Sequence, residues 1–341
     1  MDSRRICTGK HHRRLIEERD MNILILSCGT RNLLVRYFKD KKNGFDRVIG
    51  TDCSQYAPAL YETDAHYIVP TMNAPGYLDV ILDICKKETV NVVLPLQEDE
   101  LFLIASHKEI FTNQGIMPVV SEPAAIELCR DKYAMYLHLK KHGLPVIESC
   151  HSLQEFRLAE ANGLMHFPIF MKPNRGCGSI GIQKVETPEL LELLCKYSDD
   201  SIIQNFADGE ELGADIFVDS ITGKPISVFV KKKLRMRAGE TEKSISYKDE
   251  VLFDLIRKTV STLPLSGPID MDIFKVAGQY YISEINPRFG GGYPHAYECG
   301  ISFPQMICQN ALGKENTDIT GQYESGICML KYSDLVTIKP E

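Results

Sequence analysis

The stretch from Gly267 to Gly292, reading GPIDMDIFKVAGQYYISEINPRFGGG, constrains the fold more than any other part of the chain. Two runs in which apolar and polar residues alternate, IDMDIF and QYYISEIN, flank a Val-Ala-Gly turn. Alternation of this kind is typical of strands, and a turn containing Gly between two such runs indicates a β-hairpin. The sequence therefore predicts two paired antiparallel strands over this stretch.

The predicted hairpin carries three oxygen ligands suited to a metal ion. Asp272 lies on the first strand, whereas Glu284 and Asn286 lie on one face of the second. Mg²⁺ prefers a few hard oxygen ligands from the protein and completes its octahedron with water and nucleotide phosphate. Arg288 follows, with donors that suit a phosphoryl group in transfer. The alternative interpretation is an acidic hairpin exposed to solvent.

The acid on one strand and the Glu-x-Asn-Pro-Arg on the next resemble the last motif of the ATP-grasp ligases. The resemblance extends over roughly residues 21 to 310 and is strongest to single-module ligases like the large chain of carbamoyl-phosphate synthase. It implies ATP as a cosubstrate and one or two Mg²⁺ ions, or Mn²⁺, at Asp272, Glu284 and Asn286. It also implies that Arg288 is catalytic and stabilises the transferred phosphoryl group.

The composition is that of an ordinary globular protein and narrows the class of partner. The 341 residues allow two or three small domains, and the net charge of −7 makes nucleic acid a poor partner. No apolar run is long enough to span a membrane, the first twenty residues lack a signal core, and the eleven cysteines show no zinc spacing. We therefore expect a cytoplasmic enzyme with small-molecule partners, without nucleic acid or membrane, and compatible with a homodimer.

Residues 21–120 read as a doubly wound, Rossmann-like parallel sheet. The buried run 22–28 ends in Gly29, a helical segment follows, and the next strand ends in Asp52. Further strands at 66–70 and 90–97 flank a helical segment at 77–87. The turn after the first strand lacks the glycines of a dinucleotide site. Acids at 98–100 fit either a ligand at the strand's carboxyl end or a plain helix N-terminus.

A glycine-rich segment at 167–185 predicts a phosphate-binding loop. A strand carrying Lys172 leads into Gly176, Gly178, Ser179 and Gly181, and then into another strand. Glycines let backbone N–H groups close over phosphate oxygens, and the lysine adds a positive charge. The segment resembles the ATP-grasp glycine loop, and we expect residues 174–181 to form a mobile lid. The resemblance also assigns phosphate contact to Lys132, which by itself reads as an exposed helix lysine.

The segment 201–219 resembles the adenine-binding strand and hinge of the same family. Matched residue by residue, Gln204 faces adenine, Phe206 and Ala207 form the hinge, and Glu211 after Gly209 holds the ribose. The family usually has an acid where this chain has Gln204. An amide carbonyl can still accept a hydrogen bond from the adenine amino group.

The basic run at 228–244 has two interpretations. It is either a solvated strand edge, or a segment that points Arg235 or Arg237 into the cleft to hold a carboxylate or phosphate while Glu240 faces an amine. We assign Arg235 a catalytic role on the second interpretation. Tyr293 and His295 lie near the predicted acceptor site, where a lone histidine is more typical of a satisfied hydrogen-bonding residue than of a base.

Together these patterns predict a chain of class α/β and α+β in four parts. They are a flexible extension (1–20), a Rossmann-like domain (21–120), an ATP-grasp domain (121–310) whose lid-bearing lobe is about 145–205, and a short C-terminal segment (311–341). The resemblance implies a carboxylate–amine ligase that acts through an acyl phosphate, on an amino acid or similar small carboxylate. The alternatives are phosphorylation of bicarbonate or carbamate, as in carbamoyl-phosphate synthase, and a non-catalytic nucleotide-binding subunit.

Overall fold

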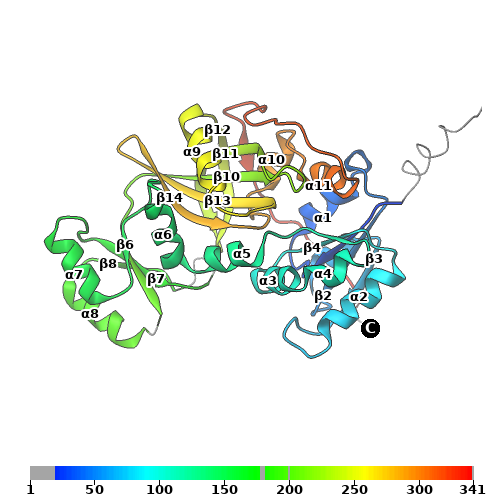
Figure 1. Cartoon of the computed structure of the whole chain (residues 1–341), viewed down its shortest axis with the longest axis horizontal. Helices are drawn as coiled ribbons and strands as arrows, with labels where there is room; N and C mark the ends of the chain where they lie inside the picture. The colour runs from blue at the N-terminus through cyan, green and yellow to red at the C-terminus, as the bar shows by residue number, and fades with distance from the viewer. Residues whose placement is uncertain (1–19, 177–180, 199, 340–341) are drawn as a thin grey trace, which may run out of the picture.

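A computed structural model describes residues 20–176, 181–198 and 200–339 (Figure 1). The chain begins with a five-stranded parallel sheet of order β3-β2-β1-β4-β5. Its central strand β1 is entirely buried, as its continuous apolar run predicts. The elements of this part are β1 (Asn22–Leu26), α1 (Asn32–Lys39), η1 (Lys41–Asn43), β2 (Arg47–Asp52), η2 (Pro58–Glu62), β3 (Ala65–Ile68), α2 (Tyr77–Lys87), β4 (Val92–Pro95), α3 (Glu98–Ser106), α4 (Lys108–Thr112) and β5 (Met117–Pro118).

A small four-stranded antiparallel sheet of order β6-β9-β7-β8 follows and lies at the opposite end of the molecule (Figure 1). It has its own apolar cluster beneath two helices, which includes Phe156, Ile169 and Leu191. The elements of this lobe and of the helices that lead to it are α5 (Pro123–Arg130), α6 (Lys132–Lys141), β6 (Ser149–Cys150), α7 (Leu153–Ala161), β7 (Ile169–Pro173), β8 (Gln183–Val185), α8 (Pro188–Tyr197) and β9 (Ser201–Asn205).

Between these two parts stands a six-stranded antiparallel sheet of order β14-β13-β10-β11-β12-β15 (Figure 1). One face carries apolar residues such as Ile269, Met271 and Ile273, which join the largest core. The elements are β10 (Glu210–Val218), β11 (Pro225–Arg237), β12 (Glu240–Tyr247), α9 (Glu250–Val260), β13 (Gly267–Val276), β14 (Gln279–Asn286), α10 (Pro294–Glu298), α11 (Phe303–Ala311) and β15 (Cys328–Leu330).

The predicted fold class is confirmed, because a parallel-sheet domain is followed by antiparallel lobes. The predicted hairpin consists of β13 and β14. The two strands pair antiparallel, from Asp270 opposite Asn286 to Val276 opposite Gln279. Its turn places Ala277 and Gly278 at φ of 49° and 83°, in the left-handed region. The predicted domain limits stay predictions, and residues 1–19, Gly178 and Ser179 lie outside the described residues. No described helix is long and apolar enough to cross a membrane.

Candidate active site

One face of the six-stranded sheet gathers the predicted metal ligands. Asp272 on β13 lies directly opposite Glu284 on β14, and Asn286 lies opposite Asp270. Residues opposite each other in an antiparallel pair, and residues two apart on one strand, point to the same face. The register of two strands therefore brings Asp272, Glu284 and Asn286 together. We call this surface, with Glu211 and Lys233 of the neighbouring strands, the charged sheet face.

A buried lysine that the sequence did not single out holds this face together. The Nζ atom of Lys233 lies 2.6 Å from Asp272 Oδ1 and 2.9 Å from Glu211 Oε1, and its side chain is only 5% exposed. Burial lowers the pKa of Lys233, but the two carboxylates raise it by more. Burial also raises the pKa of Asp272 to about 6, although Lys233 opposes that shift. Lys233 thus offsets the repulsion between Asp272 and Glu211, which lie close together on the same face of the sheet.

The charged sheet face fits Mg²⁺ by the chemistry of its donors. Asp272, Glu284 and Asn286 offer two carboxylates and one amide oxygen, all hard ligands of the kind that Mg²⁺ prefers. The part of the chain that the structure describes holds no group of three or more His, Cys, Asp or Glu side chains suited to a metal ion. The site is therefore ligand-poor by itself, as expected where nucleotide phosphates and water complete the coordination.

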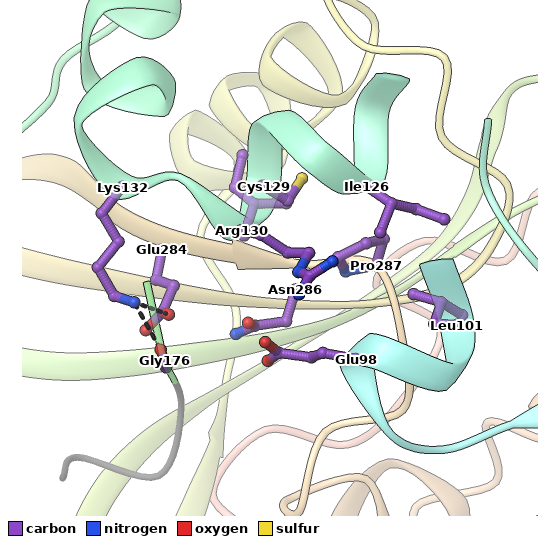
Figure 2. A pocket seen from close by; sticks show the side chains of 11 residues that line it. Glu98, Leu101, Ile126, Cys129, Arg130, Lys132, Gly176, Glu284, Asn286 and Pro287 are labelled. Carbon is purple, nitrogen blue, oxygen red and sulfur yellow. Dashed lines mark hydrogen bonds and ion pairs between the residues drawn. The ribbon is translucent and has the colours of Figure 1, made fainter. Parts of the chain in front are cut away.

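Two lysines lie beside the same carboxylates. Lys132, the first residue of α6, donates a hydrogen bond to the carbonyl of Gly176 at 2.6 Å, and its Nζ lies 3.6 Å from Glu284 Oε1 (Figure 2). Lys172 on β7 is 8% exposed; burial lowers its pKa, and the charge of Glu284 opposes this. The structure thus brings Lys132 and Lys172, the two predicted phosphate-binding lysines, to the charged sheet face. Gly176 lies there at the start of the glycine loop, and Gly181 lies at the other end of that loop.

Arg288 is fixed by partners from two domains. Its guanidinium lies 3.3 Å from Asp270 Oδ2 and 3.6 Å from Glu98 Oε1, and it donates to the carbonyl of Phe289 at 3.1 Å. Burial lowers the pKa of Arg288, but Asp270 and Glu98 raise it by more. Figure 2 shows Glu98 at the N-terminus of α3 lining one pocket with Asn286 and Glu284. Glu98 is thus an acid in the first turn of a helix, and it also lines the pocket beside Arg288, while a contact between Glu98 and a ligand stays a prediction.

The predicted nucleotide-base residues lie on and after β9. Gln204 is buried and donates to Ser149 Oγ at 2.9 Å, so its carbonyl oxygen remains as an acceptor. Phe206 packs edge-on against Phe170, with ring centroids 5.3 Å apart, and the half-buried Ala207 follows it. A side chain at Gly209 would collide with the carbonyl of Lys275, so the chain can pass close to β13 only with glycine there.

The basic run at 228–244 is neither a solvated strand edge throughout nor a segment that points Arg235 or Arg237 into the cleft. Lys231 and Lys233 are buried, because Lys231 pairs with Asp215 and Lys233 with Asp272, so the solvated-edge interpretation is wrong for both. Arg235 and Arg237 are the exposed members, at 63% and 70%, and both pair with Glu242. The structure does not bring either arginine to the charged sheet face. The catalytic role of Arg235 stays a prediction without a supporting contact.

The glycines at 290–292 are explained by charged side chains beneath them. A Cβ atom at Gly290 would collide with the Asp270 carboxylate, one at Gly291 with that of Glu240, and one at Gly292 with the ammonium end of Lys231. The buried Lys231–Asp215 pair thus supports the loop that follows Arg288. Asp270 lies two residues before the predicted ligand Asp272 on the same strand face, so period-two spacing would have found it, whereas Lys231 lies two residues before Lys233, which the sequence did not single out.

His295 is a satisfied hydrogen-bonding residue, as the sequence indicates. Its Nδ1 lies 2.8 Å from Ser244 Oγ and its Nε2 lies 3.1 Å from the carbonyl of Ile327. Burial lowers the pKa of His295 to about 4, and the nearby Lys231 adds to this shift. Tyr293 is buried and donates to the carbonyl of Ile301. Neither residue is placed to act as a general base near neutral pH.

Comparison with known proteins agrees with this geometry. Residues 23–119 match the PylC-like N-terminal domain family and residues 129–292 match the ATP-grasp domain family. The chain is 25% identical over 262 residues to a D-alanine–D-alanine ligase of Acetivibrio thermocellus, an alignment that covers 65% of this chain and 67% of that one. The chain therefore carries an ATP-grasp domain behind a PylC-like N-terminal domain, and it is an enzyme of the ligase class.

Solved structures show the same fold at low sequence identity. The biotin carboxylase domain of Hydrogenobacter thermophilus 2-oxoglutarate carboxylase, solved with MgADP and bicarbonate, has a TM-score of 0.73 at 14% identity, covering 91% of this chain and 74% of that chain. An L-amino acid ligase from Bacillus licheniformis has a TM-score of 0.67 at 20% identity, covering 88% and 76%. These likenesses establish the architecture, and the substrates of this chain have to be argued from its own residues.

Proposed function

We propose that the protein is an ATP-dependent carboxylate–amine ligase that acts on an amino acid or similar small carboxylate. The observation that carries the proposal is the charged sheet face, where Asp272, Glu284 and Asn286 lie beside two lysines and close to Arg288. A protein that only binds a nucleotide needs contacts to base and phosphates. It does not need a largely enclosed arginine that is held by two acids beside the candidate metal ligands.

The residues divide into binding and transfer roles. Gln204, Phe206, Ala207 and Glu211 would hold adenosine, while Lys132 and Lys172 would hold the phosphates. Gly176 and Gly181 would flank them. Mg²⁺ held by Asp272, Glu284 and Asn286 would neutralise charge on the phosphates. Arg288 would bind the phosphoryl group as it moves, because Asp270 and Glu98 fix its orientation before the reaction.

The reaction needs no nucleophile from the protein. An oxygen of the substrate carboxylate attacks the γ-phosphorus of ATP, the bond to the β-phosphate oxygen breaks, and ADP leaves. The amine nitrogen then attacks the carbonyl carbon of the acyl phosphate, inorganic phosphate leaves, and the nitrogen loses a proton. The chain contributes alignment and charge stabilisation to both steps.

The proposal is tested by measuring ADP and phosphate release from the full chain with Mg²⁺ATP, in the presence of single and paired amino acids. We expect at least one combination to stimulate release, and hydroxylamine to trap the acyl phosphate as a hydroxamate. Stimulation by bicarbonate and ammonia alone would show carbamoyl-phosphate-type chemistry instead. No stimulation by any of these, together with tight ADP binding, would show a non-catalytic binding subunit.

A further inference from the structure

A second cavity lies on the far side of the glycines that follow Arg288. It has a volume of about 600 Å³, and the residues that wall it include residues 30–34, Arg36, Tyr37, Glu240, Gly290, Gly291 and residues 329–336. This size is in the range of pockets that bind small molecules. We call this cavity the α1 pocket. Gly290 lies against Asp270, and Asp270 in turn pairs with Arg288. At this point only Gly290 separates the α1 pocket from the residues proposed for phosphoryl transfer.

Six charged side chains among the described residues line the α1 pocket, and three of them, Arg31, Glu240 and Lys331, form one ion-pair cluster. Glu240, at the tip of the β11–β12 hairpin, lies 3.0 Å from Arg31 and 3.1 Å from Lys331. Lys331 also donates a hydrogen bond to the carbonyl of Gly291 at 2.5 Å. Arg31 follows the strand β1, and Lys331 follows β15. One carboxylate therefore serves two cations, and the cluster carries a net positive charge.

The cluster differs from an ordinary structural ion pair in two respects. Its members are partly open, with exposed side-chain fractions of 28% for Arg31, 42% for Glu240 and 22% for Lys331. Each faces a cavity, so that a ligand can replace one protein partner without leaving a charge buried and unpaired. An ion pair with solvent access gives little net stability, which makes such an exchange inexpensive in free energy.

We infer that the α1 pocket binds an α-amino acid, with its carboxylate between Arg31 and Lys331 and its ammonium group on Glu240 and the Gly291 carbonyl. An amino acid carries its two charges next to each other, as the cluster does, and inserting it gives every charge a partner of opposite sign. The acids and cations of the pocket come from elements other than those that hold Gln204, Lys172 and Asp272. The site is therefore distinct from that of the nucleotide.

The inference rests on the proposed function only in naming the ligand as a reactant of the ligation. Binding itself is testable without ATP. Each of the twenty common L-amino acids and D-alanine is titrated into the full chain by calorimetry. The deaminated acid and the decarboxylated amine of any binder are then titrated as probes. We expect at least one amino acid to bind and both of its analogues to bind about tenfold more weakly or worse, because each lacks one charged contact.

The site is tested with Glu240→Gln and Lys331→Met, each compared with an exposed control, Glu315→Gln and Lys314→Met. We expect each site variant to bind the amino acid about tenfold more weakly than the unaltered protein does. The affinity for MgADP should stay within about twofold of that of the unaltered protein. Glu240→Gln keeps the size of the side chain, so it separates lost binding from lost folding, which thermal melting monitors. The controls should bind as the unaltered protein does.

Three outcomes would overturn the inference. They are the absence of amino-acid binding up to millimolar concentrations, equal binding of the deaminated acid, and equal binding by both site variants. These outcomes are measured as binding without ATP, whereas a failure of the proposed function is measured as a lack of ADP release. The two failures can therefore be told apart. If an amino acid stimulates release with the same KM in both variants, the ligase proposal stands and the α1 pocket is not its site.

Discussion

The charged sheet face and the α1 pocket hold similar side chains in opposite ways. On the sheet face, acids and cations stand in the register of four adjacent strands, and Lys233 is almost wholly enclosed. In the α1 pocket, Arg31, Glu240 and Lys331 come from three segments far apart in the sequence and stay partly open. The first arrangement fixes charges for one geometry. The second leaves charges able to change partners.

The comparison predicts that changes on the sheet face affect turnover and stability, whereas changes at the pocket affect binding of one substrate. On the sheet face the enclosed Lys233 depends on its acids, so that removing an acid leaves a buried charge without a full set of partners, which is costly. In the pocket a lost partner is replaced by water or ligand, which costs little. The predictions below test this difference, beginning with the largest expected effect.

Glu284→Gln should leave the fold intact and reduce turnover about a thousandfold or more. The amide keeps the size of the side chain but removes a charge that would hold Mg²⁺, whose stabilisation of the transferred group is worth several kcal/mol. The measurement is ADP release with the stimulating substrates across Mg²⁺ concentrations, with Glu315→Gln as control. Unchanged activity with unchanged Mg²⁺ dependence would remove Glu284 from the metal site.

Lys233→Met should lower the free energy of unfolding by about 2 kcal/mol, because Asp272 and Glu211, which are 25% and 34% exposed, lose the cation that they share. Mg²⁺ with ADP should recover part of this loss. The control is Lys232→Met on the same strand, whose lysine is 31% exposed and pairs with Glu210. It should change stability by no more than about 0.5 kcal/mol. Equal denaturation midpoints for the two variants would contradict the assignment.

Glu100→Gln extends the comparison to a buried acid without a cation. Tyr77 donates to Glu100, and burial raises the pKa of Glu100 from 4.5 to about 7. A carboxyl group whose pKa is raised by folding favours the folded state below the unfolded pKa, and this advantage is lost as pH rises through about 7. The variant, which resembles the protonated acid, should therefore be more stable than the unaltered protein by up to about 3 kcal/mol at pH 8.

The two proteins should differ little near pH 4.5, where Glu100 is protonated in the folded chain and about half protonated in the unfolded chain. Urea unfolding at several pH values measures this. A gain in stability that is the same at every pH would show that the substitution acts through packing and not through the charge of Glu100.

The smallest effect is expected at Arg235. Arg235→Lys keeps the charge of a side chain that is 63% exposed and bound to Glu242, so KM for the amino acid should stay within about twofold. Arg31→Lys loses the bidentate geometry of a guanidinium in the α1 pocket, and KM should rise severalfold with KM for ATP unchanged. The reverse order would restore Arg235 as the substrate clamp and exclude Arg31.

The fold and the gathering of residues on the charged sheet face could be predicted because they depend on local patterns. Period-two alternation around Asp272 and Glu284 fixes both strand and face, and register then brings the two together. The glycine spacing after Lys172 and the Glu-x-Asn-Pro-Arg motif are likewise short stretches. Such signals need no knowledge of distant parts of the chain.

The α1 pocket could not be predicted for the opposite reason. Arg31 follows a strand in a turn without any recognisable pattern, and Lys331 lies in the short C-terminal segment, to which the sequence assigns no motif. Arg235 attracted attention because it stands in a basic run, but its partner Glu242 across the hairpin turn holds it at the surface. Whether a charged residue faces a cleft depends on tertiary contacts, which a single sequence does not display.

The edge strand β15 has a consequence for how the enzyme is made. The strands of the sheet face, up to Asn286, leave the ribosome before the segment that carries Lys331, which closes the α1 pocket across from Arg31. Domains generally fold as they emerge. A nascent or truncated chain ending before β15 would therefore present nucleotide-binding residues without a complete acceptor pocket. Such a chain would hold no substrate carboxylate to attack ATP, so it is expected to bind the nucleotide without turnover until β15 is in place.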